Sequence, residues 1–74
     1  MKEKILKILS GIRPECDFTQ SVDFIEEGML DSMDIVNLVT EIEDEFDIEI
    51  PATDISIKHF NSISNIIKII EKQL

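Results

Sequence analysis

The chain has 74 residues, a formal net charge of −9 and one cysteine. This length has room for one domain, residues 1–74, and the strong negative charge repels nucleic acid and anionic membranes. Because Cys16 has no second cysteine to pair with and no apolar run approaches the roughly 20 residues of a membrane-spanning helix, we expect a soluble cytoplasmic protein without disulfides or a transmembrane segment.

The first predicted element is a helix over residues 3–12. Its apolar residues recur at i, i+3, i+4 and i+7, which is one stripe of a helix: Ile5, Ile8, Leu9 and Ile12. Residues 13–30 then read as a long loop that Pro14 opens and Gly28 closes. Loops of this length are uncommon unless they pack on the core or serve function. The loop also carries scattered apolar residues, so we expect several of them to fill the space between helices.

Residues 32–46 give the strongest helix prediction. Asp31 is placed to cap this helix, with Asp34 three residues on in a capping-box pattern. The expected buried face consists of Met33, Ile35, Val36, Leu38, Val39, Ile42 and Phe46. The expected exposed face consists of Asp34, Asn37, Glu41, Asp44 and Glu45.

The remaining elements are shorter. Residues 48–50 alternate before Pro51, and we expect an extended loop with Ile48 and Ile50 pointing inward. Residues 54–60 predict a short helix whose Ile55, Ile57 and Phe60 face the core, and residues 62–73 predict a last helix capped by Ser62. The fold class is therefore all-α: a small four-helix bundle of three main helices plus a short one, with a long first loop.

Acidic residues are concentrated in the middle of the chain. No lysine or arginine lies between Arg13 and Lys58, whereas fourteen of the sixteen acids lie from Glu15 to Asp54. The predicted helix 32–46 contains no lysine or arginine that would offset its acids. Like charges one turn apart destabilise a helix, so this arrangement has a cost in stability. A face of one sign attracts proteins with basic patches and speeds their encounter. The alternative is that the acidity only keeps the chain in solution.

Ser32 stands where the long loop ends and the strongest helix begins. A serine at a helix start commonly caps the helix. A Ser32–His59 pair is a second possibility on paper, because a hydrolase needs a nucleophile and a base, but 74 residues leave little room for a pocket and an oxyanion hole. No specific calcium or zinc motif is present, so we expect no metal site.

The sequence around Ser32 resembles the phosphopantetheine site of the acyl carrier protein family. The segments that carry the resemblance are Gly28-Met29-Leu30, Asp31-Ser32-Met33, Glu43-Asp44-Glu45-Phe46, Asp47-Ile48-Glu49-Ile50-Pro51 and Phe60-Asn61-Ser62-Ile63. The signature of that family is Asp-Ser-Leu, from which Met33 departs conservatively. The resemblance covers nearly the whole chain, and length, acidity and helix order agree with it.

The resemblance implies that Ser32 bears 4'-phosphopantetheine, transferred from coenzyme A by a separate phosphopantetheinyl transferase. The thiol of this arm carries acyl groups as thioesters between enzymes, as in fatty-acid or polyketide-type biosynthesis, and the protein itself is not an enzyme. The implied partners are loading ligases and synthases or transferases with basic docking patches, and we expect a monomer. The residues implied in docking are Asp31, Met33, Asp34, Ile35, Asn37, Thr40, Glu41, Glu43 and Asp44.

Three alternatives stay open at this point. Methionine after the serine also resembles D-alanine carriers of cell-wall polymer modification, so a D-alanyl or an aminoacyl or peptidyl carrier is the alternative within the family. An acidic adaptor that binds a basic protein without being modified is a second alternative. The third is the small hydrolase using Ser32 and His59.

Overall fold

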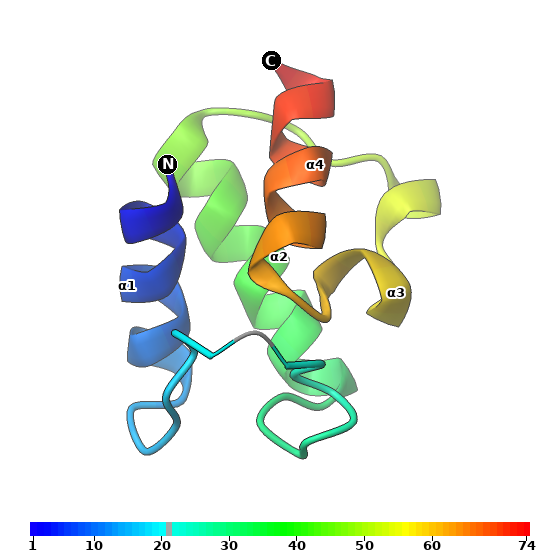
Figure 1. Ribbon diagram of the computed structural model, residues 1–74. Helices are drawn as coiled ribbons and strands as arrows, with labels where there is room; N and C mark the ends of the chain where they lie inside the picture. Colours follow the sequence, from blue (N-terminus) through cyan, green and yellow to red (C-terminus); the bar gives the residue numbers. More distant parts are fainter. Residues whose placement is uncertain (21) are drawn as a thin grey trace.

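The computed structural model describes residues 1–20 and 22–74, and its regular structure there is entirely helical (Figure 1). The longer helices are α1 (Lys2–Ile12), α2 (Ser32–Phe46) and α4 (Ile63–Gln73). The shorter ones are α3 (Ile57–Phe60) and a 3-10 turn, η1 (Ala52–Asp54). The predicted bundle of three main helices and a short one is confirmed. In the part described, no helix has the length and apolar character needed to cross a membrane.

The helices enclose one apolar core. Helix α1 packs against α2 and α4, and α3 packs against the same two helices. Each of the four α-helices contributes fully buried side chains: Ile5, Leu9, Leu38, Ile42, Phe60, Ile66 and Ile70. Burying a side chain of this size stabilises a fold by roughly 1.5–3 kcal/mol. Both termini lie at the top of Figure 1, and the long loop and the start of α2 lie at the opposite end.

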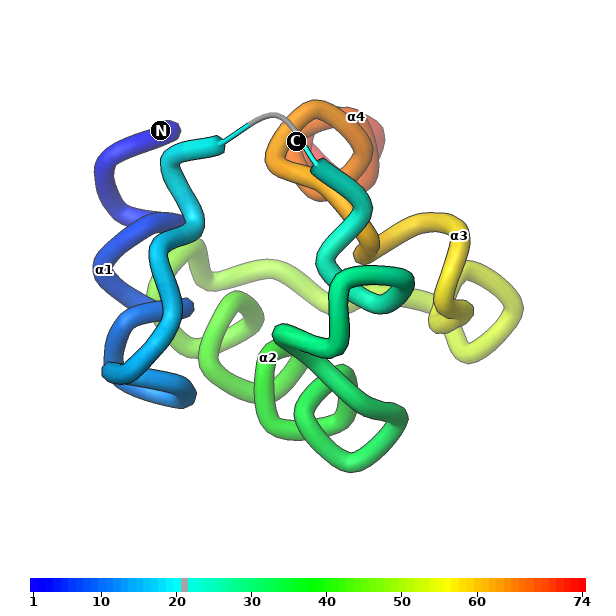
Figure 2. The backbone as a smooth tube through the Cα atoms, turned by 60° about the horizontal axis from the view of Figure 1, so that its bottom comes forward, coloured from blue at the N-terminus to red at the C-terminus, as the bar shows by residue number. Residues whose placement is uncertain are grey.

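The long loop completes the core at that end, as the sequence predicts. Phe18, Phe24 and Leu30 are buried, and the rings of the two phenylalanines meet edge to face with centroids 5.0 Å apart. Such aromatic pairs contribute about 0.5–1.5 kcal/mol beyond their buried area. In Figure 2 the described parts of the loop cross in front of the helices on their way to α2. The loop therefore acts as a cover that fixes where α2 begins.

Asp23 and Asn61 fasten this loop to the junction between α3 and α4. The backbone N–H of Phe24 donates to the carbonyl of Asn61 at 2.7 Å, and the Asn61 amide donates to the Asp23 carboxylate at 2.9 Å. Asp23 also accepts from two backbone N–H groups of its own turn, those of Ile25 and Glu26. These bonds hold the pKa of Asp23 below its usual range, chiefly through the Glu26 N–H. The loop is thus tied directly to the α3–α4 junction.

Three residues of α2 do not lie where the sequence placed them. Met33 and Val36 were expected in the core, but they are 69% and 56% exposed. At 100° per residue they lie opposite Leu38 and Ile42, which are fully buried. Asp34 was expected on the exposed face, but it is 8% exposed because it contacts Arg13.

The predicted helix 54–60 is also wrong in part. The backbone of Ile55 is extended and ends η1, so a new turn, α3, starts after Ser56. Ile55 and Ile57 are consequently 37% and 49% exposed, and Phe60 alone of the three expected side chains is in the core. The segment before η1 agrees better with its prediction, because Ile50 is buried and its N–H donates to the Glu43 carboxylate at 2.9 Å.

Candidate functional site

Asp31, not Ser32, caps helix α2. The Asp31 carboxylate accepts the backbone N–H of Asp34, and the Asp34 carboxylate accepts the backbone N–H of Asp31, both at 3.0 Å. This reciprocal capping box satisfies two donors that a helix start otherwise leaves unpaired. Ser32 therefore occupies the first helical position and is exposed there. The reading of Ser32 as a helix cap is excluded, because Asp31 already holds that role.

Arg13, at the end of α1, binds both carboxylates of the capping box. Its Nη2 lies 2.6 Å from Asp34 Oδ2 and 3.3 Å from Asp31 Oδ2, and its Nε donates to Asp34 Oδ2 at 2.8 Å. The Arg13 hydrogen bond is the main reason why the pKa of Asp34 lies below its usual range, although burial opposes that shift. The same bond raises the pKa of Arg13. Two charges that flank Ser32 are thereby held by the preceding helix.

The start of α2 suits a negatively charged group on Ser32. Backbone N–H groups of the first turn and the helix dipole both favour an anion at this end of a helix. The acids next to Ser32 oppose an anion, but the structure turns carboxylate oxygens of both Asp31 and Asp34 toward Arg13. An exposed hydroxyl here fits the geometry that a covalent phosphodiester requires.

His59 does not form the pair with Ser32 that the sequence left open as an alternative. Its Nδ1 lies 2.9 Å from the backbone carbonyl oxygen of Asp54 and 3.0 Å from Ser56 Oγ. A carbonyl oxygen only accepts hydrogen bonds, so Nδ1 carries the proton. In that tautomer the free lone pair is on Nε2, and among the residues that the structure describes no hydrogen bond joins His59 to Ser32. The histidine instead fastens the start of α3 to η1, and this arrangement gives no support to the hydrolase hypothesis.

The exposed face of α2 extends away from Ser32 and combines apolar and acidic side chains. Of the residues implied in docking, two are buried, Asp34 and Ile35, and Glu43 is half-buried. The exposed ones are Asp31, Met33, Asn37, Thr40, Glu41 and Asp44. Val36 belongs to the same face but was not predicted to lie there. A helical projection shows it, because Val36 follows Met33 by three residues and residues three apart share a helix face. Ile57 of α3, which the sequence had placed inside, is also exposed.

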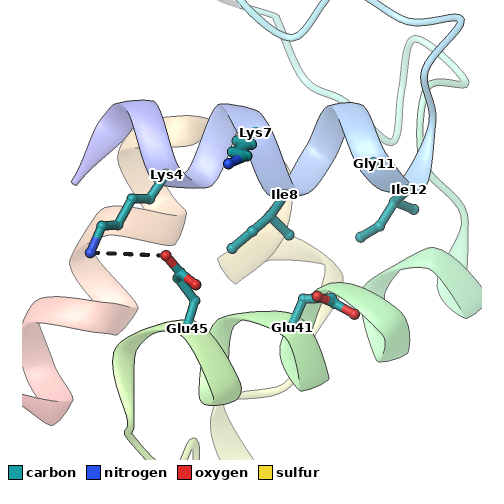
Figure 3. A pocket seen from close by; sticks show the side chains of 7 residues that line it. All are labelled: Lys4, Lys7, Ile8, Gly11, Ile12, Glu41 and Glu45. Atoms are coloured by element: carbon teal, nitrogen blue, oxygen red, sulfur yellow. Dashed lines mark ion pairs between the residues drawn. The ribbon is translucent and has the colours of Figure 1, made fainter.

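A groove between α1 and α2 borders this face at Glu41 (Figure 3). Its volume is about 360 Å³, and its lining residues are Lys4, Lys7, Ile8, Gly11, Ile12, Glu41 and Glu45. Lys4 Nζ lies 3.9 Å from Glu45 Oε1 and 5.7 Å from the centre of the Phe46 ring. The two lysines of α1 thus partly offset the acids of α2 on this side, whereas Asp44 lies outside the groove.

A family model described as "Phosphopantetheine attachment site" matches residues 3–70 of the chain. A D-alanyl carrier protein of Lactococcus lactis subsp. cremoris is 35% identical over 68 residues, which is 89% of this chain and 86% of that protein. Aminoacyl carrier protein 1 of Bradyrhizobium diazoefficiens is 32% identical over 78 residues, covering 100% of this chain and 86% of the relative. An acyl carrier protein of Phenylobacterium zucineum is 39% identical over 56 residues, or 76% and 68% of the two chains.

The match to the family model spans all four α-helices except the ends of α1 and α4. It also agrees with the exposed hydroxyl at the start of α2 and with the helical fold. The cofactor of such a protein is covalently attached 4'-phosphopantetheine. The chain therefore belongs to the family of phosphopantetheine-binding carrier proteins.

Proposed function

We propose that residues 1–74 act as a single carrier domain in which Ser32 bears the 4'-phosphopantetheine arm. The observation that carries this proposal is that two adjacent residues at the start of α2 have separate roles. Asp31 caps the helix through its side chain, so the Ser32 hydroxyl is exposed without being needed for the cap. In the loading step, Ser32 Oγ bonds to the phosphorus of coenzyme A that bears the pantetheine. The bond from that phosphorus to the adenosine-bisphosphate group breaks, and the serine proton goes to a base.

The base belongs to a separate phosphopantetheinyl transferase in this proposal. The one histidine of the chain holds its Nδ1 proton against the Asp54 carbonyl and is not paired with Ser32. The residues of the chain itself place the hydroxyl on a fixed helix start and favour the phosphodiester through backbone N–H groups. Delivery to successive enzymes, rather than catalysis, is the role that this arrangement supports. A cytoplasmic location is part of the proposal, because transferase and coenzyme A must both meet Ser32.

The cargo that we propose is an aminoacyl group, with D-alanyl as the first candidate. Relatives that are matched over 89% and 100% of this chain are named D-alanyl and aminoacyl carrier proteins. An acyl group of fatty-acid or polyketide-type biosynthesis is the second candidate. It is favoured by the relative named acyl carrier protein, which is matched over 76% of the chain. In both cases the thiol of the arm holds the group as a thioester.

Partner enzymes are proposed to dock on the exposed face of α2 beside Ser32. We define this docking face as Asp31, Met33, Val36, Asn37, Thr40, Glu41, Glu43 and Asp44. Asp34 and Ile35 are left out because both are buried. Met33 and Val36 supply apolar contact next to the arm, whereas the acids supply attraction to a basic patch. Charges at the rim of such an interface act mainly on encounter rate and salt sensitivity, which suits a carrier that must leave each partner.

Intact-protein mass spectrometry tests the attachment. The apo-protein is incubated with coenzyme A and a broad-specificity phosphopantetheinyl transferase, and the expected result is a mass gain of one arm. Ser32→Ala abolishes this gain, whereas Ser64→Ala, which removes an exposed serine from the first turn of α4, leaves it intact. An unmodified wild-type protein, or a gain that survives Ser32→Ala, contradicts the proposal and favours an adaptor that only binds.

The cargo is tested on the loaded protein. Holo-protein is incubated with ATP and either an adenylating ligase for D-alanine or one for fatty acids, and thioester formation is followed by mass. The proposal expects transfer from the amino-acid ligase at a rate well above that from the fatty-acid ligase. Efficient loading by the fatty-acid ligase alone overturns the aminoacyl assignment while leaving the attachment at Ser32 intact.

A further inference from the structure

Arg13 places a positively charged side chain at the start of α2. No lysine or arginine occurs from residue 14 to residue 57, so the loop and α2 contain none of their own. The guanidinium reaches across from the end of α1 and contacts Asp34, Asp31 and, at 3.5 Å, Glu15. Its side chain is 31% exposed, whereas that of Asp34 is 11% exposed. One charged group from the preceding helix therefore controls the charge beside Ser32.

The phosphodiester adds a negative charge where two acids already stand. Asp31 precedes Ser32 directly, and Asp34 follows in the same helical turn. With Arg13 in place, these three side chains carry one net negative charge, and the phosphodiester brings the total to two. Without Arg13 the total would be three, with the Asp34 carboxylate left buried and unpaired. Like charges this close repel each other, and the repulsion is stronger near a protein surface than in bulk water.

We propose that Arg13 is a positioning residue for the loading of Ser32 and for the stability of the loaded form. It holds the carboxylates of Asp31 and Asp34 in the capping box, and it offsets their charge against the incoming phosphate. This inference rests on the proposed attachment at Ser32. It assigns to Arg13 a function that a simple clamp between α1 and α2 does not have.

A clamp between α1 and α2 and a residue that offsets the phosphate charge predict different stabilities for the unloaded and the loaded protein. A clamp contributes the same stability to both forms, because the phosphodiester does not change the contacts between the helices. A residue that offsets the phosphate contributes more to the loaded form. The difference between the two losses is a coupling between Arg13 and the arm, as in a double-mutant cycle.

The experiment measures urea unfolding of apo- and holo-protein for wild type, Arg13→Gln, Arg13→Lys and Lys68→Gln. Lys68→Gln is the matched control, because it removes one positive charge from an exposed position on α4. We expect Arg13→Gln to lower the folding equilibrium constant of the holo form at least about threefold further than that of the apo form at low salt. High salt should shrink this difference. Arg13→Lys, which keeps the charge, should show little of this difference, and Lys68→Gln should show none.

Transferase kinetics give a second readout. Arg13→Gln should lower kcat for loading with little change in KM for the carrier, because the loss concerns charge at the reacting serine and removes no side chain of the docking face. Should Arg13→Gln fail to fold, the cycle is run on Asp34→Asn, in which removing Arg13 leaves no buried charge behind. Equal losses in apo- and holo-protein, or a change in KM alone, overturn the proposal for Arg13 although wild type is loaded. A wild type that cannot be loaded overturns both this inference and the attachment at Ser32.

Discussion

Substitution of Asp31 should lower the stability of the protein, whereas substitution of Ser32 should abolish loading and leave the stability nearly unchanged. Asp31→Ala removes the carboxylate that accepts the Asp34 N–H at 3.0 Å. Loss of such a cap costs about 1 kcal/mol, within a range of roughly 0.5–2 kcal/mol. For a domain of about 60–100 residues, each kcal/mol corresponds to a fall in Tm of about 4–8 °C. Ser32→Ala removes an exposed hydroxyl that is not the cap, so its effect should stay within about 0.5 kcal/mol.

Helix α4 supplies controls for both substitutions. Ser62 is its cap and accepts the Asn65 N–H at 3.2 Å, whereas Ser64 is an exposed serine in its first turn. Ser62→Ala should therefore lower Tm as Asp31→Ala does, and Ser64→Ala should behave as Ser32→Ala does. Thermal unfolding of the apo-proteins by far-UV circular dichroism gives Tm, and mass spectrometry gives the loaded fraction. Only Ser32→Ala should abolish loading.

Two results would refute this reasoning. A fall in Tm for Ser32→Ala as large as that for Asp31→Ala would mean that the serine caps the helix after all. An unchanged Tm for Asp31→Ala would mean that the capping box does not stabilise α2.

Three further predictions follow from the core, the buried acid and the docking face. Phe60→Ala should destabilise the protein by about 3–5 kcal/mol in urea unfolding, since Phe60 is fully buried, and a loss below about 1 kcal/mol would contradict the packing. Because the folded-state pKa of Asp34 is depressed, the stability that its carboxylate contributes is fully present above about pH 4 and is lost as pH falls through that lower pKa. Urea unfolding at stepped pH should show this loss, and Asp34→Asn should flatten the dependence of stability on pH. Reversing Glu41 and Asp44 to lysine should raise the transferase KM at low salt without lowering Tm, and an unchanged KM would argue against the docking face.

Local patterns predicted most of the fold. The stripe in residues 3–12 and the apolar spacing in 62–73 gave α1 and α4 to within one residue at each end. The pair Asp31 and Asp34 predicted the capping box because that motif depends only on spacing along the chain. The scattered apolar residues of the loop predicted a packed cover, which the buried Phe24 confirms.

The errors have two physical sources. Met33 and Val36 were placed inside because they are apolar, whereas their angle around α2 already puts them outside; this error was avoidable. The burial of Asp34 was not predictable from spacing, because it depends on a contact with Arg13, 21 residues earlier in the chain. The hydrogen bond of His59 was not predictable from spacing either, because its partner carbonyl belongs to a 3-10 turn that no periodicity indicated.

The bonds between the long loop and Asn61 have a consequence for how the protein opens. They join residues 23 and 24 to a position 37 or more residues later, so they cannot persist when either the loop or the α3–α4 junction comes apart. The amide of Phe24, which lies in this contact and in the core, should therefore exchange with solvent only when most of the molecule unfolds. A protease that cuts near Phe24 should likewise act only on the globally unfolded chain, at a rate set by overall stability. The long connection is thus a part of the cooperative unit, and the freedom to swing between enzymes must come from the arm.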